Sequence, residues 1–507
     1  MRTDETTGTG RRPVWAWLPV PVLVALAAAP LVLHWLGNPD DQRLVDLDVY
    51  RTGGEMVLSG RPVYDFWTPA PQLLPFTYPP IAALLATPLA AMSWTAAQWV
   101  WTAGIFVTLA VAVRHGFRAV WERLDRVRPV NRPMGRPVNR PVGRPVGRSA
   151  DQSADRSAEA EGAEPRAAGP AGGPVGSLAG GPAGGPAGGP AGGGAPWRPP
   201  RPLWTPLALA FLMVACTYLM PIRDQVRFGQ VDILLVALCV ADCLARRPAW
   251  PRGMLIGLAT AVKLTPGVFL VYLLVTGFGP GARAEQRRAF SMAAFTAALL
   301  TLLPFAVIPS DAADFWFRAL LDPERLGANA ATTNQSMRGM LIRLYLPETP
   351  TTIVWLALVA LVGWYGFRAA RRALLDGDAP TAVALTGLMA VLLSPVAWIH
   401  HLAWVVVVLG AVAGDGRDPV RVRVAAGVWL YYVVPIPWWG VALKAAEIPV
   451  LSPVLGKLVQ NAFGLGALAL VWLLGSWLPR RRAAFLPSGT FRTPDVDVSA
   501  PFRTAAG

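Results

Sequence analysis

The feature that most constrains the fold is a recurrence of apolar blocks along a chain of 507 residues. Several blocks reach the roughly 20 residues that a helix needs to cross the hydrocarbon core of a bilayer. Apolar residues make up 53% of the chain and charged residues 15%, whereas a soluble protein carries about 25% charged residues. The pattern predicts an all-α polytopic membrane protein with about 10 to 13 membrane segments. It excludes an ordinary soluble enzyme, a disulfide-rich secreted domain and a disordered scaffold.

Basic residues outnumber acidic ones and give a formal net charge of +15. In a soluble protein this excess would suggest nucleic-acid binding. Here arginine gathers in short loops between apolar blocks, as the positive-inside rule requires of cytoplasmic loops. We therefore expect no nucleic-acid partner. The three cysteines all lie inside apolar stretches, which favours packing over disulfide or metal chemistry.

The order of apolar and polar segments divides the chain into five parts. These are a cytoplasmic N-terminus (1–13), an N-terminal membrane part (14–125), a disordered Arg/Pro/Gly-rich cytoplasmic linker (126–202), a C-terminal membrane part (203–478) and a cytoplasmic tail (479–507). The long loop 37–78 follows the first span and lies outside the membrane by this topology. Because it is long for a loop, we expect it to carry short helices of its own.

Two apolar blocks disturb the alternation of inside and outside. Block 79–92 is short and starts with proline, so it either dips into the membrane or pairs with the next span. Block 252–277 has arginine on both sides. It contains Lys263-Leu264-Thr265-Pro266, and proline disfavours helix in the residues before it. We expect two short helices that are broken there.

The first candidate site is Asp46-Leu47-Asp48-Val49-Tyr50 in the outer loop. A carboxylate just outside a span can act as a general base, although a solvated loop acid is the ordinary alternative. Phe76-Thr77-Tyr78-Pro79-Pro80 marks the return to the membrane, where Tyr78 at the interface has a structural explanation.

A second outer loop contains Asn334-Gln335-Ser336, followed by Arg338 and Arg343. The first three residues match a glycosylation sequon. Asn334 and Gln335 could equally offer amide donors to a sugar, with Arg338 meeting a phosphate.

Three further polar features lie within or beside apolar blocks. His400 and His401 stand at the outer end of a span, which favours a site over packing. Neighbouring side chains point to different sides of a helix, so we do not expect the two rings to form a metal site. Lys263 could neutralise a lipid phosphate or snorkel to the interface. Gln230 and Asp232 stand at the start of another span, and their polar groups could line the same cavity as Lys263.

Six segments together resemble glycosyltransferase family 87, the bacterial polyprenyl-phosphate-mannose-dependent α-mannosyltransferases of the GT-C superfamily. They are DLDVYRTGGEMVLSGRPVYDF, FTYPP, FGQVDILLVAL, RGMLIGLATAVKLTPGVFLVYLL, NQSMRGMLIRL and LLSPVAWIHHLAW. They occur in the family's order between about residues 44 and 405, outside the linker, which is this chain's main departure from the family. No single segment is specific, and their common order carries the resemblance.

The resemblance implies a GT-C-like fold with the catalytic acid in the first outer loop, where Asp46 is the matching position. It implies a multi-pass enzyme of the bacterial cytoplasmic membrane whose active site faces outward. The donor would be a polyprenyl-phosphate sugar, with mannose as the default, and the acceptor an envelope glycolipid or glycan. Transfer would proceed with inversion. Residues expected to bind substrate are Tyr50, Tyr78, Gln230, Lys263, Asn334, Gln335, Arg338, His400 and His401.

We expect no cofactor and no metal, since no Gly-rich phosphate loop is present and no carboxylate cluster demands an ion, although the Asp46/Asp48 pair leaves a divalent metal open. Two other classes compete with an enzyme. A transporter or flippase of lipid-linked sugars would need inverted repeats and ionisable residues at mid-membrane in both halves, and no internal repeat is evident. A non-enzymatic envelope assembly protein would leave Asp46, Lys263 and the histidine pair unexplained.

Overall fold

The computed structural model describes residues 14–39, 42–126 and 204–485. Within these ranges the chain is helical and contains no strand, only two isolated bridges, Trp67 with Pro75 and Asn334 with Trp398. The expected all-α polytopic architecture is therefore confirmed. The N-terminus 1–13, the linker 127–202 and the tail beyond 485 lie outside the described residues, so the expectations for them stay predictions.

The N-terminal membrane part contains five α-helices. They are α1 (Pro19–Leu36), α2 (Val45–Leu58), α3 (Pro80–Ala90), α4 (Trp94–Gly116) and α5 (Arg118–Arg126). Helix α2 lies within the segment predicted as an outer loop, so the expectation that this segment carries a helix of its own is confirmed.

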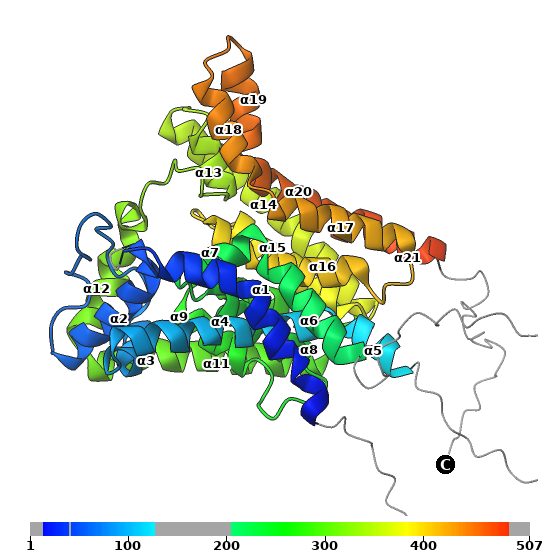
Figure 1. The fold of residues 1–507 in the computed structure, drawn as a ribbon, viewed down its shortest axis with the longest axis horizontal. Coiled ribbons are helices and arrows are strands. Elements are labelled where there is room, and N and C mark those ends of the chain that lie inside the picture. Colours follow the sequence, from blue (N-terminus) through cyan, green and yellow to red (C-terminus); the bar gives the residue numbers. More distant parts are fainter. Residues whose placement is uncertain (1–13, 40–41, 127–203, 486–507) are drawn as a thin grey trace, which may run out of the picture. The chain divides into compact units, whose positions relative to one another are not determined.

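The C-terminal membrane part contains sixteen α-helices and several short 3₁₀ turns in the described range. The α-helices are α6 (Trp204–Thr217), α7 (Met220–Phe228), α8 (Asp232–Leu244), α9 (Met254–Val262), α10 (Val268–Gly277), α11 (Ala284–Val307), α12 (Pro309–Phe317), α13 (Met337–Ile342), α14 (Glu348–Leu375), α15 (Ala379–Leu392), α16 (Val405–Ala413), α17 (Pro419–Val433), α18 (Ile436–Ala445), α19 (Leu451–Gln460), α20 (Ala462–Trp472) and α21 (Leu478–Phe485). Helices α18 and α19 form a hairpin that projects beside α13 (Figure 1).

Five helical segments are long and apolar enough to cross a membrane, or seven if each of two bent helix pairs counts as one span. The five are Trp15–Leu36, Trp94–Gly116, Ala284–Val307, Glu348–Leu375 and Ala462–Ala484. The bent pairs are α6 with α7, at 78°, and α17 with α18, at 48°. Four shorter apolar segments accompany them. The larger count of 10 to 13 membrane segments stays a prediction.

The core is centred on α15 and α16, which are short for spans and buried on all sides. Every residue from Thr381 to Leu392 is buried, and so is every residue from Val405 to Val412. A helix that is apolar all round is expected inside a protein and not at its lipid-facing surface. The 3₁₀ turn η7 (Ile399–Trp404) joins these two helices and carries the histidine pair.

The predicted break inside block 252–277 is present. Helix α9 ends at Val262, and Lys263 adopts an extended conformation, with φ of −150° and ψ of 134°. A short 3₁₀ turn over Thr265–Gly267 then leads into α10. Proline removes a backbone donor, so the helix cannot continue through this point. The break takes the Lys263 side chain out of the regular helical surface.

Two adjacent glycines bring α2 against its neighbours. A Cβ atom on Gly54 would lie 2.7 Å from the backbone of Ala86 in α3, and one on Gly53 would lie 2.6 Å from the Phe76 ring. Side chains of any size would therefore push α2 away. The close contact fixes α2, and the acidic residues in its first turn, against the membrane part of the protein.

Candidate active site

Asp46 lies in the first turn of α2. The residue that precedes this helix, Leu44, has a left-handed backbone conformation. Acidic residues are favoured there because the helix dipole is positive at its N-terminus. The residue keeps part of its surface exposed. Burial of the carboxyl group raises the pKa of Asp46 to about 7, against the opposing effects of a Gln230 hydrogen bond and of Lys263. A carboxylate with a pKa near the working pH suits general-base chemistry.

Asp48 is the other acid of this turn and has a different environment. Burial also raises the pKa of Asp48, and the nearby charge of Arg51 lowers it. The influences on its pKa come from Arg51 and Glu55 of its own helix, whereas those on Asp46 come from the C-terminal membrane part. The structure therefore places Asp46, and not Asp48, at the contact between the two membrane parts.

Tyr50, Tyr78 and Gln230 form a hydrogen-bonded group next to Asp46. The two tyrosine hydroxyls are 2.9 Å apart. Tyr50 Oη donates to Gln230 Oε1 at 3.1 Å, and Tyr78 Oη lies 3.4 Å from the same oxygen. Because these hydroxyls occupy Oε1, the amide NH₂ of Gln230 is left to donate to the Asp46 carboxylate. All three residues were expected at the site, and the structure brings them together.

A tight turn between α7 and α8 presents Gln230 to this group. Gly229 ends α7 in a left-handed conformation with φ of +73°. A Cβ atom there would lie 2.8 Å from the Cβ of Leu47. Trp101 of α4 donates through Nε1 to the Gly229 carbonyl at 2.7 Å. Glycine at position 229 therefore allows both the left-handed turn and the close approach of α2.

Lys263 forms an ion pair with Asp232, the first residue of α8. Its Nζ lies 2.8 Å from Asp232 Oδ1, 3.1 Å from His401 Nε2 and 5.3 Å from the centre of the Tyr78 ring. Both charged side chains are largely buried. The sequence suggested that Lys263 neutralises a lipid phosphate; in the structure its charge is already paired with a carboxylate.

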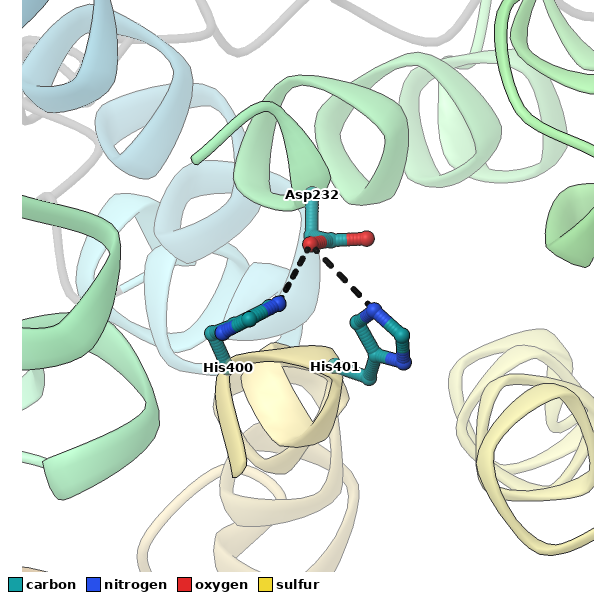
Figure 2. Close-up of side chains that lie close together, drawn as sticks. All are labelled: Asp232, His400 and His401. Atoms are coloured by element: carbon teal, nitrogen blue, oxygen red, sulfur yellow. Dashed lines mark ion pairs between the residues drawn. The ribbon is translucent and has the colours of Figure 1, made fainter. Parts of the chain in front are cut away.

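The two histidine rings face the same carboxylate oxygen (Figure 2). His400 Nε2 is 3.7 Å and His401 Nε2 is 3.8 Å from Asp232 Oδ2. The rings meet edge to face, with centroids 4.8 Å apart. The expectation that neighbouring histidines diverge was wrong. It assumed a regular α-helix, whereas both residues lie in the 3₁₀ turn η7.

Gln225 holds this arrangement in place and was missed from the sequence. Its Nε2 donates to the His400 carbonyl at 2.9 Å, and its Oε1 accepts from the Ile233 backbone at 3.3 Å. The side chain thus ties η7 to the start of α8. The signal available in the sequence was a second glutamine five residues before Gln230. Asp232 was noted at the sequence level without a role.

Asn334 and Gln335 do not join the Asp46 group. Asn334 is fully buried, and its Oδ1 accepts from the backbone of Ser336 and of Ala397. Gln335 bonds to the Thr332 and Gln460 carbonyls and to the Gly464 amide. These contacts support the segment that leads into η7. Their predicted role in sugar binding stays a prediction.

Arg338 and Arg343, which follow Gln335 along the chain, have contacts that do not include Asp46. Arg338 lies over the Trp355 ring, 5.6 Å from its centre. Arg343 is buried and donates to Ala331, Asn334 and Asn461. Phosphate binding by Arg338 stays a prediction, and Arg343 has a clear scaffolding role.

Asp232, His400 and His401 are the group within the described ranges that could hold a metal ion, since one ligand atom from each lies within 4.8 Å of the others. Together with Asp46, the site offers a carboxylate base, tyrosine hydroxyls and one ammonium in a largely buried setting. Such a set can move a proton and bind a polar substrate group. The fold is that of a multi-pass membrane protein, and these residues form its candidate active site.

The chain belongs to glycosyltransferase family 87, whose family model matches residues 76–140 and 191–395. It is 32% identical to a polyprenol-phosphate-mannose-dependent alpha-(1-2)-phosphatidylinositol mannoside mannosyltransferase of Mycolicibacterium smegmatis, across 86% of this chain and 85% of the relative. The expected family, and with it the expected class of enzyme, is confirmed.

Two more relatives show the same kind of similarity. The Mycobacterium tuberculosis protein of the same name is 30% identical across 84% of this chain and 83% of its own length. A polyprenol-phosphate-mannose-dependent alpha-(1-2)-phosphatidylinositol pentamannoside mannosyltransferase of Mycolicibacterium smegmatis is 25% identical across 83% of this chain and 81% of its own length. No solved structure matches the chain.

Proposed function

We propose that this protein transfers mannose from polyprenyl-phosphate-mannose to a phosphatidylinositol-mannoside type of glycolipid. The reaction takes place at the outer face of the bacterial cytoplasmic membrane, with inversion at the sugar carbon. Family membership and the names of the relatives support the donor and the acceptor class. The outer face is supported by the distribution of arginines, which assigns the loop that carries Asp46 to the outside.

The observation that carries the mechanism is the position of Asp46. The residue is half-buried, burial of its carboxyl group raises the pKa of Asp46 to about 7, and it lies beside Gln230 and the Lys263–Asp232 pair. Near neutral pH, a large share of the population is ionised and able to accept a proton. An ordinary surface aspartate with a pKa near 3.9 would be a weaker base.

The chemistry follows in one displacement. Asp46 accepts the proton of an acceptor hydroxyl, and the hydroxyl oxygen attacks the anomeric carbon of the lipid-linked sugar. The bond from that carbon to the phosphate oxygen breaks, and polyprenyl phosphate leaves with the bonding electrons. A β-linked donor then yields an α-linked product. The phosphate leaves as a stable anion, so the acceptor side is where base catalysis contributes most.

The neighbouring side chains provide positioning and polarity. Gln230 holds the Asp46 carboxylate, while Tyr50 and Tyr78 fix the amide of Gln230. We also propose that these tyrosine hydroxyls contact hydroxyl groups of the sugar. Preorganised polar groups of this kind stabilise developing charge without reorganising at the moment of reaction.

The proposal is tested with the purified full-length protein in lipid nanodiscs. The protein is given a phosphatidylinositol mannoside acceptor and either radiolabelled polyprenyl-phosphate-mannose or radiolabelled GDP-mannose. We expect labelled glycolipid from the lipid donor alone, and release of the label by an α-mannosidase. Transfer from the nucleotide sugar, or movement of the intact lipid donor across a bilayer without transfer, contradicts the proposal.

A further inference from the structure

The two oxygens of the Asp232 carboxylate have different surroundings. Oδ1 receives Lys263 Nζ at 2.8 Å. Oδ2 has no hydrogen-bond partner in the structure, although it is buried. His400 Nε2, also buried, likewise has none. These two orphaned atoms face each other at 3.7 Å, and His401 Nε2 lies 3.8 Å from the same oxygen (Figure 2).

Distances of this size are too long for hydrogen bonds but close to those between ligands of one metal ion. A tetrahedral ion with bonds of about 2.0 to 2.1 Å keeps its ligand atoms about 3.4 Å apart. The two distances from the carboxylate oxygen would need to close by only a few tenths of an ångström. The three ligand atoms lie within 4.8 Å of one another, so the two imidazoles would also need to move toward each other. Buried polar atoms without partners are rare and call for an explanation.

The ligand types select the kind of ion. Two imidazoles and one carboxylate suit zinc and other first-row divalent metals, whereas magnesium and calcium prefer sets of oxygen ligands. Gln225 Nε2 donates to the His400 backbone carbonyl at 2.9 Å and so fixes the turn that carries both rings.

We propose that Asp232, His400 and His401 form a binding site for a zinc-type divalent cation, beside Asp46 and in competition with the Lys263 ammonium. The ammonium lies 3.1 Å from His401 Nε2, a nitrogen that the ion would take. Binding of the ion therefore requires Lys263 to release His401, while the lysine can keep its contact with Asp232 Oδ1.

A role for the ion follows from charge, and this role, unlike the site, rests on the proposed function. The leaving phosphate gains a negative charge as the bond to the sugar breaks. Lys263 is already neutralised by Asp232 at 2.8 Å. A divalent ion on Oδ2 adds the positive charge that this pair does not supply, and metal ions stabilise leaving oxygens of this kind.

The site is tested by zinc binding to the full-length protein, purified without a polyhistidine tag and stripped with a chelator. Equilibrium dialysis followed by elemental analysis should find about one zinc ion per chain. His400→Gln and His401→Gln should each weaken binding by at least ~10-fold. His34→Gln is the matched control, because His34 lies in α1, does not belong to the ligand group, and its variant should bind like the wild type.

Lys263→Met gives the sharpest result, because removal of the competing ammonium should tighten zinc binding, opposite in sign to the loss of a ligand. Cobalt substitution should produce visible absorption bands that His400→Gln removes. Each variant is compared with the wild type in its metal-free melting profile, so that misfolding is separated from ligand loss. Equal zinc stoichiometry and affinity in wild type and His400→Gln overturn the site.

The role is tested separately by mannose transfer before and after chelation. Transfer that falls after chelation and returns with zinc supports the role. Transfer unaffected by chelation overturns the role and leaves the site intact. Specific zinc binding without transfer under either condition contradicts the proposed function and not the metal site.

Discussion

Tyr50 Oη donates a 3.1 Å hydrogen bond to Gln230 Oε1, which joins two segments 180 residues apart in the chain. Tyr50 belongs to α2, and Gln230 belongs to the turn between α7 and α8. The bond orients the Gln230 amide toward Asp46. The acid in the first turn of α2 is thus held by the C-terminal membrane part.

Gln230→Leu should slow transfer by about 10- to 100-fold, because Asp46 loses the donor that orients it. The Gln230 hydrogen bond lowers the pKa of Asp46, so its removal should move the acid limb of the pH–rate profile to higher pH. Gln98→Leu, which removes a buried glutamine of α4, is the control for a general loss of packing. An unshifted profile in Gln230→Leu contradicts the assigned role.

The wild-type enzyme should lose activity below about pH 7. Burial raises the pKa of Asp46 to about 7, so acidification protonates the base. In kcat/KM the loss should approach tenfold per pH unit well below that value. Steady-state transfer measured between pH 5 and pH 9 tests this, with the lipid donor held below its KM. A rate that stays constant down to pH 5 contradicts a base with a raised pKa.

The raised pKa of Asp46 also predicts that the stability of the fold falls as pH rises, whereas the activity rises. A carboxyl group whose folded pKa lies above its unfolded pKa makes the folded state less stable as pH rises from about 4 to about 7. Asp46→Asn should remove this effect and raise the melting temperature more at pH 8 than at pH 4.5. Scanning fluorimetry on nanodisc samples measures the melting temperatures of wild type and Asp46→Asn at both pH values. An equal increase at pH 8 and pH 4.5 would contradict a raised pKa of Asp46.

Gly229→Ala should destabilise the protein and impair transfer. The residue has φ of +73°, which costs about 1 to 2 kcal/mol for a residue with a Cβ atom. That atom would also lie 2.8 Å from Leu47 Cβ and displace the first turn of α2. Gly60→Ala is the control, since Gly60 also has a positive φ but has open space around it. Equal losses of transfer in both variants would exclude a specific effect on Asp46.

Asp232→Asn should destabilise the fold by about 3 to 5 kcal/mol, because it leaves Lys263 as an uncompensated buried charge. Glu55→Gln breaks the exposed pair with Arg61 and should cost at most about 1 kcal/mol. Thermal or denaturant unfolding of both variants compares the two pairs. A similar small effect of both substitutions would show that the Asp232–Lys263 pair is well solvated.

Patterns along the sequence predicted the elements of the fold better than their contacts. Apolar block length identified the helices, and Pro266 predicted the helix break beside Lys263, because both depend on local backbone chemistry. Asp46 and the histidine pair were selected as polar groups next to apolar blocks. Local patterns could not show that the rings converge on Asp232, since this depends on the packing of the 3₁₀ turn η7 against α8.

Long-range packing explains what the sequence did not reveal. Asn334 and Gln335 look like substrate ligands by residue type, yet in the structure their amides satisfy buried backbone groups near Ala397 and Gly464. Gln225 was missed because it stands in a polar segment between apolar blocks, and its partner, the His400 carbonyl, lies 175 residues away in the chain. Such assignments require knowledge of which segments meet in space.

The central claim is that Asp46 is the base, and the most direct test is mannose transfer by Asp46→Asn beside Asp48→Asn. Both variants keep the size of the side chain and remove one carboxylate from the same helical turn. We predict that Asp46→Asn loses ~10²- to 10⁴-fold in kcat at pH 7.5, while donor binding persists and Asp48→Asn retains most of its activity. Wild-type rates in Asp46→Asn, or a larger loss in Asp48→Asn, would contradict the account.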